Sequence, residues 1–207
     1  ALARDPSSLL AGVQPAFDQA ELVVGNLETA VTERGTPAPK TYTFRAPEKF
    51  VTALKDGGID VVSLANNHGM DYGTTGLEDS LAARQNTGMP VIGIGANVEE
   101  AFAPYTTTIN GQRIAVVAAS QVLDSSLMSA WTAGPDKPGM ASAYDEDRLI
   151  AAVESARRDN DVVVAFLHWG TERQECPNQR QRDLEQKLKE AGAQVIVGSH
   201  AHVLVGG

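Results

Sequence analysis

Four histidines carry the strongest chemical signal in this sequence of 207 residues. Each follows a short apolar, β-branched run and stands beside Gly or Asn: His68 within ANNH, His168 at the start of HWGTE, and His200 and His202 within GSHAH. Parallel strands bring their carboxyl ends to one edge of a sheet, where open α/β folds place their ligand sites. The four imidazoles are therefore candidates for one common site, and imidazole is the commonest metal ligand in proteins.

Oxygen ligands accompany these nitrogens. Asn26 and Glu28 follow the first apolar run, in ELVVGNLET. Burying a carboxylate at the end of a strand costs free energy unless the carboxylate is paired with, or bound to, a cation. Imidazole, carboxylate and amide groups without thiolate suit zinc, manganese, iron and related divalent ions, and the sequence does not choose among them. Because side chains alternate along an extended segment, His200 and His202 are expected to face the same side.

Each of these residues also has a simpler interpretation. A single histidine at a strand end is more often a hydrogen-bonded structural residue than a ligand. Asn67 alone fits a turn, and Glu28 alone could pair with Arg45 or Lys40. Arg45 itself fits a structural ion pair as well as a substrate contact. The argument for a site depends on all four histidines falling at predicted strand exits.

Composition excludes several classes of protein. Hydrophobic residues make up 43% and charged residues 21% of the chain, as in ordinary globular proteins, so disordered and coiled-coil classes are excluded. The formal charge is 17 − 26 = −9, which argues against a nucleic-acid partner. Cys176 is the single cysteine, so no internal disulfide can form. No apolar run approaches the roughly 20 residues of a membrane span, and ALARDPSSLL at the start does not resemble a signal peptide.

The elements expected to position these side chains alternate between strands and helices. Apolar runs predict strands at 22–25, 61–65, 91–94, 114–119, 162–167 and 195–197, each buried on both faces. Amphipathic stretches predict helices at 47–56, 74–87, 145–159 and 178–191. Asn110-Gly111 predicts a hairpin and hence a mixed sheet, and residues 121–144 are expected to form a long surface loop. The pattern predicts an α/β fold.

Five motifs in order resemble a known family. NLET (26–29), YTFRAP (42–47), ANNHGMDYG (65–73), HWGTE with PNQRQ (168–181) and GSHAHV (199–203) resemble the bacterial capsule synthesis protein CapA family. That family is associated with poly-γ-glutamate capsule synthesis or export and is similar to calcineurin-like metallophosphoesterases. The resemblance runs from about Asp5 to Gly206. It implies a four-layer α/β/β/α sandwich with two mixed sheets, formed by residues 1–207 as one domain that lacks its first strand and its C-terminal part.

The resemblance also implies roles for individual residues. It makes Glu28, Asn67, His168 and His200 ligands of one metal, with Glu28 bridging to a second metal that His202 also binds. It makes His68 the general acid or a phosphate contact, with Asp71 orienting its ring. Arg45, Asn26 and Glu172 are the candidates for substrate binding.

Cofactors and function follow from the same resemblance. Two divalent cations (Mn, Zn or Fe) are expected in the intact protein, and partial or no occupancy in this chain, because the family's Gly-Asp motif would precede its first residue. The leading hypothesis is metal-dependent hydrolysis of a phosphoester, or processing of an anionic polymer. The alternatives are a non-catalytic subunit that binds or exports poly-γ-glutamate with a membrane synthase, and a phosphoesterase fold retained only for structure. An extracytoplasmic or membrane-anchored location is expected, through a segment outside this chain.

Overall fold

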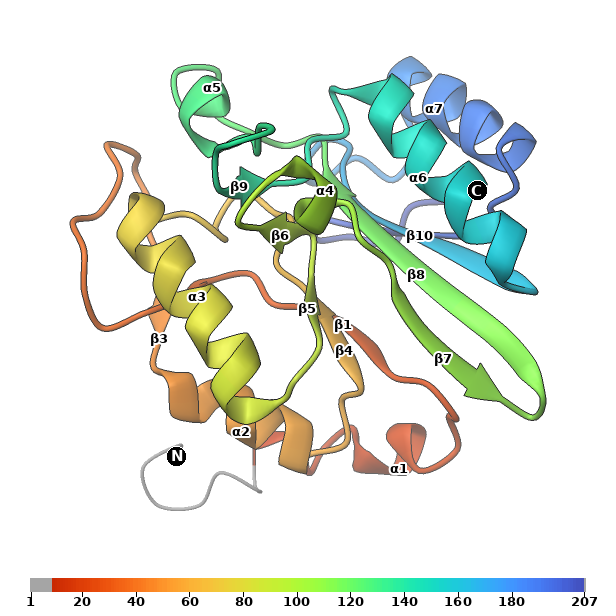
Figure 1. The fold of residues 1–207 in the computed structure, drawn as a ribbon, viewed down its shortest axis with the longest axis horizontal. Helices are drawn as coiled ribbons and strands as arrows, with labels where there is room; N and C mark the ends of the chain where they lie inside the picture. The colour runs from red at the N-terminus through yellow and green to blue at the C-terminus, as the bar shows by residue number, and fades with distance from the viewer. Residues whose placement is uncertain (1–8, 207) are drawn as a thin grey trace. The chain divides into compact units, whose positions relative to one another are not determined.

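The computed structural model describes residues 9–206, and contacts within the chain divide it into two compact units (Figure 1). The first unit contains the described residues up to Leu64 together with His68–Val91. The second contains Ala65–Asn67 and the residues from Ile92 onward. The beginning of the family resemblance, at Asp5, and most of ALARDPSSLL lie outside the described residues.

The first unit combines short strands with two substantial helices. Its strands are β1 (Val24–Asn26), β2 (Ala30–Val31), β3 (Arg45–Ala46) and β4 (Val61–Ser63), and β5 (Val91–Ile92) begins at its last residue. Its helices are α1 (Gln14–Phe17), α2 (Glu48–Asp56) and α3 (Gly73–Thr87). Strands β1 and β4 run parallel in a sheet of order β1-β4-β5, and β2 pairs with β3 in a separate parallel ladder.

The α2–β4 segment shows how the sequence directs the chain toward the candidate site. Pro47 precedes the first turn of α2, where a missing N–H costs nothing. Gly58, with φ of 91°, adopts a left-handed conformation beyond the end of the helix. Strand β4 then runs through the buried Val61 and Val62 and delivers the chain to ANNH. The helix predicted at 47–56 and the strand predicted at 61–65 correspond to α2 and β4.

The second unit contains the larger sheet. Its strands are β6 (Ile94–Gly95), β7 (Tyr105–Ile109), β8 (Gln112–Ser120), β9 (Gly139–Met140), β10 (Val162–His168) and β11 (Val195–Ser199). Its helices are α4 (Val98–Ala101), α5 (Met128–Trp131), α6 (Glu146–Asp159) and α7 (Gln179–Glu190). The main sheet has the order β11-β10-β8-β7, and β6 pairs with β9.

This sheet is mixed, as predicted. Strands β8, β10 and β11 are parallel, whereas β7 is antiparallel to β8 across the turn at Asn110-Gly111. Both turn residues have positive φ, 51° and 81°, as a two-residue hairpin turn of this kind requires. The confirmed hairpin shows that local turn chemistry was a sound guide to topology.

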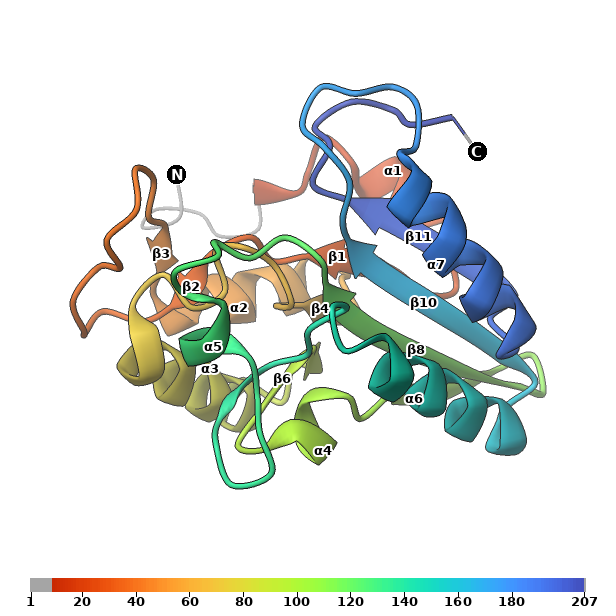
Figure 2. The ribbon, with the colours of Figure 1, turned by 90° about the horizontal axis from the view of Figure 1, so that it is seen from above.

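The core of the second unit lies between this sheet and helices α6 and α7, which Figure 2 shows running beside it. Ala115, Val117 and Ala119 of β8 and Val163, Ala165 and Leu167 of β10 are buried in that core. They pack with Leu149 and Val153 of α6 and with Leu184 and Leu188 of α7. Since side chains alternate along a strand, His168 points to the face of the sheet opposite the one that packs in this core.

Three expectations about the elements are wrong. The predicted strand at 91–94 is divided, because Gly93 has φ of 81° and separates β5 from β6 in different sheets. Residues 121–144 are not only a surface loop, because they contain α5 and β9 and bury Trp131 and Met140. Strand β11 is not buried on both faces: it lies at the edge of its sheet, and Val195 and Val197 are 44% and 37% exposed.

The α/β fold class with mixed strand directions is confirmed, whereas the four-layer arrangement and the single-domain boundary stay predictions. Among the helices of residues 9–206, none is both long and apolar enough to cross a bilayer.

Candidate functional site

The second unit places two of the candidate ligands at one edge of its sheet. Strand β10 ends at His168 and β11 ends at Ser199, and these two residues are register partners in the parallel ladder. His200 follows directly. The chemistry-bearing motifs HWGTE and GSHAH therefore begin at the same level of neighbouring strands, as expected for the carboxyl edge of a parallel sheet.

His168 is buried and held at both ring nitrogens. Its Nε2 atom lies 2.7 Å from Oδ1 of Asn67, and its Nδ1 atom lies 2.9 Å from Oγ of Ser199. Its exposed fraction is 1%. Asn67 belongs by its contacts to the second unit, together with Ala65 and Asn66. The ANNH segment thus brings an amide oxygen to the imidazole of a strand 101 residues away.

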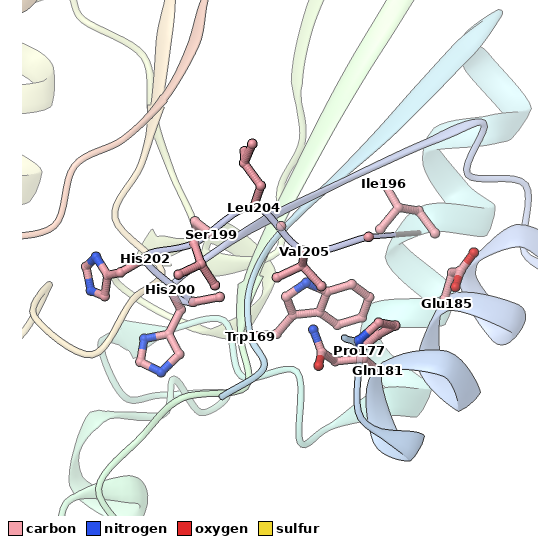
Figure 3. A pocket seen from close by; sticks show the side chains of 14 residues that line it. Trp169, Pro177, Gln181, Glu185, Ile196, Ser199, His200, His202, Leu204 and Val205 are labelled. Atoms are coloured by element: carbon pink, nitrogen blue, oxygen red, sulfur yellow. The ribbon is translucent and has the colours of Figure 1, made fainter. Parts of the chain in front are cut away.

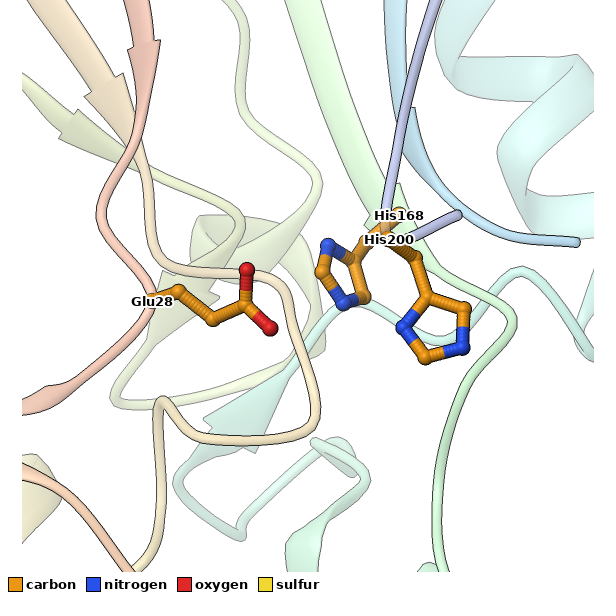
Figure 4. A group of neighbouring side chains, drawn as sticks. All are labelled: Glu28, His168 and His200. Carbon is orange, nitrogen blue, oxygen red and sulfur yellow. The ribbon is translucent and has the colours of Figure 1, made fainter. Parts of the chain in front are cut away.

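His200 lies next to His168, and Figure 4 shows the two imidazoles. Their ring centroids are 4.9 Å apart and the rings are tilted by 56°. His202 is farther out: it is exposed, and its ring centroid is 6.2 Å from that of His200. The structure thus gathers Asn67, His168 and His200 closely, with His202 at the border.

The expectation that His200 and His202 lie on an extended segment is wrong. Strand β11 ends at Ser199, and His200 and His202 have φ of 92° and 54°. Both are left-handed backbone conformations, which are rare for residues other than Gly and cluster at functional sites. Side chains alternate between two sides only along an extended backbone, so alternation does not predict the directions of these two imidazole rings.

His68 is held by a separate set of contacts in the first unit. Its Nδ1 atom lies 2.6 Å from Oδ2 of Asp71, and its ring centroid is 4.3 Å from that of Phe44. The Phe44 backbone N–H donates to the same Asp71 oxygen at 2.6 Å. Lys40 lies 3.0 Å from the other oxygen, Oδ1. Asp71 is fully buried, and this set of contacts fixes the orientation of the His68 ring.

Glycine is needed immediately after His68. A Cβ atom on Gly69 would lie 2.2 Å from the carbonyl oxygen of Leu64, far closer than any atom can approach. The turn that carries His68 therefore folds back tightly on the end of β4. This close approach gives a structural reason for the glycine in ANNHG, next to the predicted role of His68.

Asn26 is the last residue of strand β1 in the first unit, and Glu28 follows two residues later. The Asn26 side-chain amide donates to Oε2 of Glu28 at 2.8 Å, and both residues are partly buried. Of the two cations considered as partners of Glu28, Lys40 forms its described ion pair with Asp71, and the Arg45 guanidinium lies over the ring of Tyr72.

The two remaining substrate-binding candidates are exposed. Arg45 lies 5.1 Å from the Tyr72 ring centroid and reaches the Glu33 carbonyl at 3.5 Å. Glu172 lies in the turn that follows strand β10, next to Arg173, whose φ is 60°. The contacts of Arg45 are those of a structural side chain. Substrate binding by Arg45 and by Glu172 stays a prediction.

A cavity of about 370 Å³ opens beside His200 and His202 in the second unit (Figure 3). Trp169 and Ile196 form part of its wall, and His200 and His202 line it as well. Gly198 makes room for this wall, because a Cβ there would meet Nε1 of Trp169 at 2.6 Å. His168 is not among the residues that line this cavity.

The donor set fits a divalent metal. His168 and His200 offer imidazole nitrogen and Asn67 offers amide oxygen, a combination suited to zinc, manganese or iron. The 2.7 Å separation between Nε2 and Oδ1 is a hydrogen-bond distance. It is shorter than the roughly 3.0–3.4 Å between two ligands that each lie about 2.1 Å from one ion, so the two side chains would move slightly apart to share a cation. Sequence reasoning missed Ser199, Lys40 and Phe44, although Ser199 stands within GSHAH.

Comparisons with known proteins agree with the motifs. The family described as "Bacterial capsule synthesis protein PGA_cap" matches residues 1–206. The chain is 33% identical over 200 residues to the PGA biosynthesis protein CapA of Bacillus subtilis, covering 95% of this chain and 51% of that protein. It is 31% identical to the capsule biosynthesis protein CapA of Bacillus anthracis, covering 93% of this chain and 47% of that protein. It therefore spans about half the length of these relatives.

The fold has a counterpart among solved structures. A "Putative 5'-Nucleotidase" from Staphylococcus aureus superposes with a TM-score of 0.52 at 16% identity, covering 74% of this chain and 31% of that one. This likeness concerns the fold alone and is consistent with the metallophosphoesterase-like class expected from the motifs. Because the family match extends over nearly all of its length, the chain belongs to the bacterial capsule synthesis protein family PGA_cap.

Proposed function

We propose that this chain carries the metal site of a capsule synthesis protein and hydrolyses a phosphoester or processes an anionic polymer such as poly-γ-glutamate. The observation that carries the proposal is the contact between His168 and Asn67, reinforced by the ring of His200. Motifs far apart in the sequence thus bring an amide oxygen and imidazole nitrogens, which are common metal ligands, close together. The family membership supports poly-γ-glutamate synthesis as the biological setting.

The proposed ligands are those that the motifs indicated. Asn67, His168 and His200 would hold one divalent cation, and the motifs indicate Glu28 and His202 as the further ligands. Such ions, when bound, lower the pKa of a coordinated water and neutralise the charge that develops on phosphoryl oxygens. The requirement for a cation would also explain how a chain with a formal charge of −9 accepts an anionic substrate.

His68 would supply the proton that the leaving oxygen needs. Its Nδ1 donates to the buried carboxylate of Asp71, so the proton for the leaving oxygen would come from Nε2 of the doubly protonated ring, which leaves the ring neutral with its proton on Nδ1. Asp71 fixes the tautomer and the ring direction, and Phe44 covers one face of the ring. His68 follows Asn67 directly in the chain, so the proposed acid and a proposed metal ligand are joined by a single peptide bond.

The experiment combines metal analysis with an assay. The chain is purified, its zinc and manganese content is measured, and hydrolysis of an aryl phosphate is followed with added manganese. His68→Ala and His200→Ala should each reduce hydrolysis at least 100-fold, whereas Asn86→Ala, at an exposed asparagine of the first unit, should not. Equal rates for both histidine variants and the unchanged chain would refute the catalytic proposal.

A binding role is the second candidate, favoured by the names of the relatives, which describe biosynthesis rather than hydrolysis. In that case the chain would bind poly-γ-glutamate and guide it to a membrane-bound synthase on the outer side of the membrane. Chelation separates the two functions. A hydrolase loses activity when EDTA removes the metal, whereas a polymer-binding subunit keeps its affinity for poly-γ-glutamate.

A further inference from the structure

Ser199 contacts the ring nitrogen of His168 that Asn67 does not contact. Its Oγ atom is 2.9 Å from His168 Nδ1 and 3.3 Å from the carbonyl oxygen of Leu167. Ser199 and His168 are register partners on neighbouring parallel strands, so the backbone holds this distance. Figure 3 shows Ser199 beside His200 at the edge of the cavity. The sequence motifs assigned no role to this serine.

The hydrogen-bond partners determine the tautomer of His168 when no cation is bound. Oδ1 of Asn67 can only accept, so His168 Nε2 must carry the ring proton and donate across the 2.7 Å contact. His168 Nδ1 is then an acceptor. The hydroxyl of Ser199 satisfies it by donating its proton.

Coordination at Nε2 requires the other tautomer. The Nε2 lone pair must then face the ion, so the ring proton leaves Nε2 and a proton joins Nδ1, with exchange through solvent and no net gain of protons by the ring. The Ser199 hydroxyl can accept from Nδ1–H, and it turns its own proton to the Leu167 carbonyl. A hydroxyl serves both states because it is both donor and acceptor.

We infer that Ser199 is a positioning residue that allows His168 to change tautomer and so raises the affinity of the site for a divalent cation. This inference rests on the metal site of the proposed function. The physical reason is burial: His168 is 1% exposed, and without the hydroxyl its Nδ1–H would lack this partner in the coordinated state. Partners of this kind behind ligating histidines typically change metal affinity 10–100-fold.

A matched pair of variants isolates the hydroxyl. Ser199→Thr and Ser199→Val have nearly the same shape, and threonine keeps the hydroxyl that valine lacks. Ser120→Ala is the control, because Ser120 is the register partner of His168 on the opposite side, in β8, and its Oγ bonds the backbone of Val122 instead. Each chain is titrated with zinc chloride by calorimetry, and the His168 ring nitrogens are followed by ¹⁵N NMR.

We expect Ser199→Val to bind zinc 10–100-fold more weakly than Ser199→Thr, and Ser120→Ala to bind like the unchanged chain. The NMR spectra should show the proton on His168 Nε2 without zinc and on Nδ1 with zinc. Equal affinities for the Thr and Val variants, or a proton on Nδ1 in both states, overturn the inference while leaving the metal site standing. If the unchanged chain does not bind zinc, the metal site itself fails, and the inference fails with it.

Discussion

Nε2 of His168 lies 2.7 Å from Oδ1 of Asn67, although 101 residues separate them in the chain. Strand β10 ends at His168, and the ANNH segment delivers Asn67 after β4. Neither residue would indicate a metal site by itself, since a buried histidine bonded to an asparagine is an ordinary structural pair. The neighbouring ring of His200, in a rare backbone conformation, distinguishes this pair from an ordinary one.

Zinc should stabilise the chain through this pair. A cation that binds only the folded state raises the free energy of unfolding by about 2.7 kcal/mol when its free concentration is 100 times the dissociation constant. The gain should disappear in Asn67→Ala and His168→Ala and persist in Asn86→Ala, measured by urea denaturation with zinc and with EDTA. Equal stabilisation of all four chains would show that zinc binds elsewhere.

Strain at His200 predicts an unusual order of variants. His200 has φ of 92°, a backbone conformation that glycine adopts without strain and alanine does not. The His200→Gly variant should therefore be more stable than His200→Ala by about 1 kcal/mol. Both variants should lose zinc affinity. At His168, the last residue of β10, the order should reverse, because glycine weakens a strand by roughly 0.5–1 kcal/mol relative to alanine. Thermal and urea unfolding check both pairs.

Removal of Lys40 should lower the free energy of unfolding, because the buried carboxylate of Asp71 loses its cationic partner. The Asp71 side chain is 0% exposed and that of Lys40 is 11% exposed, so Lys40→Met leaves a buried carboxylate without this cation and should destabilise the chain by about 3 kcal/mol. In an Asp71→Asn background the same change should cost at least 1 kcal/mol less. Lys49→Met, at an exposed position of α2, should change stability by less than about 0.5 kcal/mol. Strict additivity of the two changes would contradict this pairing.

The ion pair of Arg34 and Asp79 predicts a pH dependence. The hydrogen bond from the Arg34 guanidinium, assisted by that from the Thr32 hydroxyl, lowers the pKa of Asp79 below its usual value. A carboxyl whose pKa is depressed on folding contributes stability above its unfolded pKa, about 3.9, and that contribution is lost as the pH falls through the folded pKa. The stability difference between the unchanged chain and Asp79→Asn should therefore be constant above about pH 5 and shrink below pH 4. Urea denaturation at pH 7 and pH 3 measures it, and a difference that grows in acid would reverse the assigned sign.

Local signals in the sequence were sufficient for the helices and for one hairpin. The predicted helix at 178–191 exists as α7, and Asn178 and Gln181 form a reciprocal capping box, each accepting at 3.0 Å from the other's backbone N–H. The hairpin at Asn110-Gly111 formed because those residues tolerate positive φ. These features depend on neighbours in sequence, so a pattern can predict them.

Burial and backbone conformation at the ends of strands depended on distant contacts. The run 195–197 is as apolar as the other strands, yet its position at the sheet edge leaves Val195 and Val197 exposed. The GSHAH motif predicted ligands, but the left-handed backbone at His200 and His202 contradicts the alternation that an extended segment would show.

The sequence by itself determined the residue types, their placement at strand exits and the family to which the chain belongs. Only the tertiary structure decided which atoms meet: Asn67 Oδ1 with His168 Nε2, His168 Nδ1 with Ser199 Oγ, and Asp71 with Lys40. The physical reason is that side-chain contacts between strands are set by sheet order and register. Register depends on how whole elements pack, and this information is not contained in any short stretch of sequence.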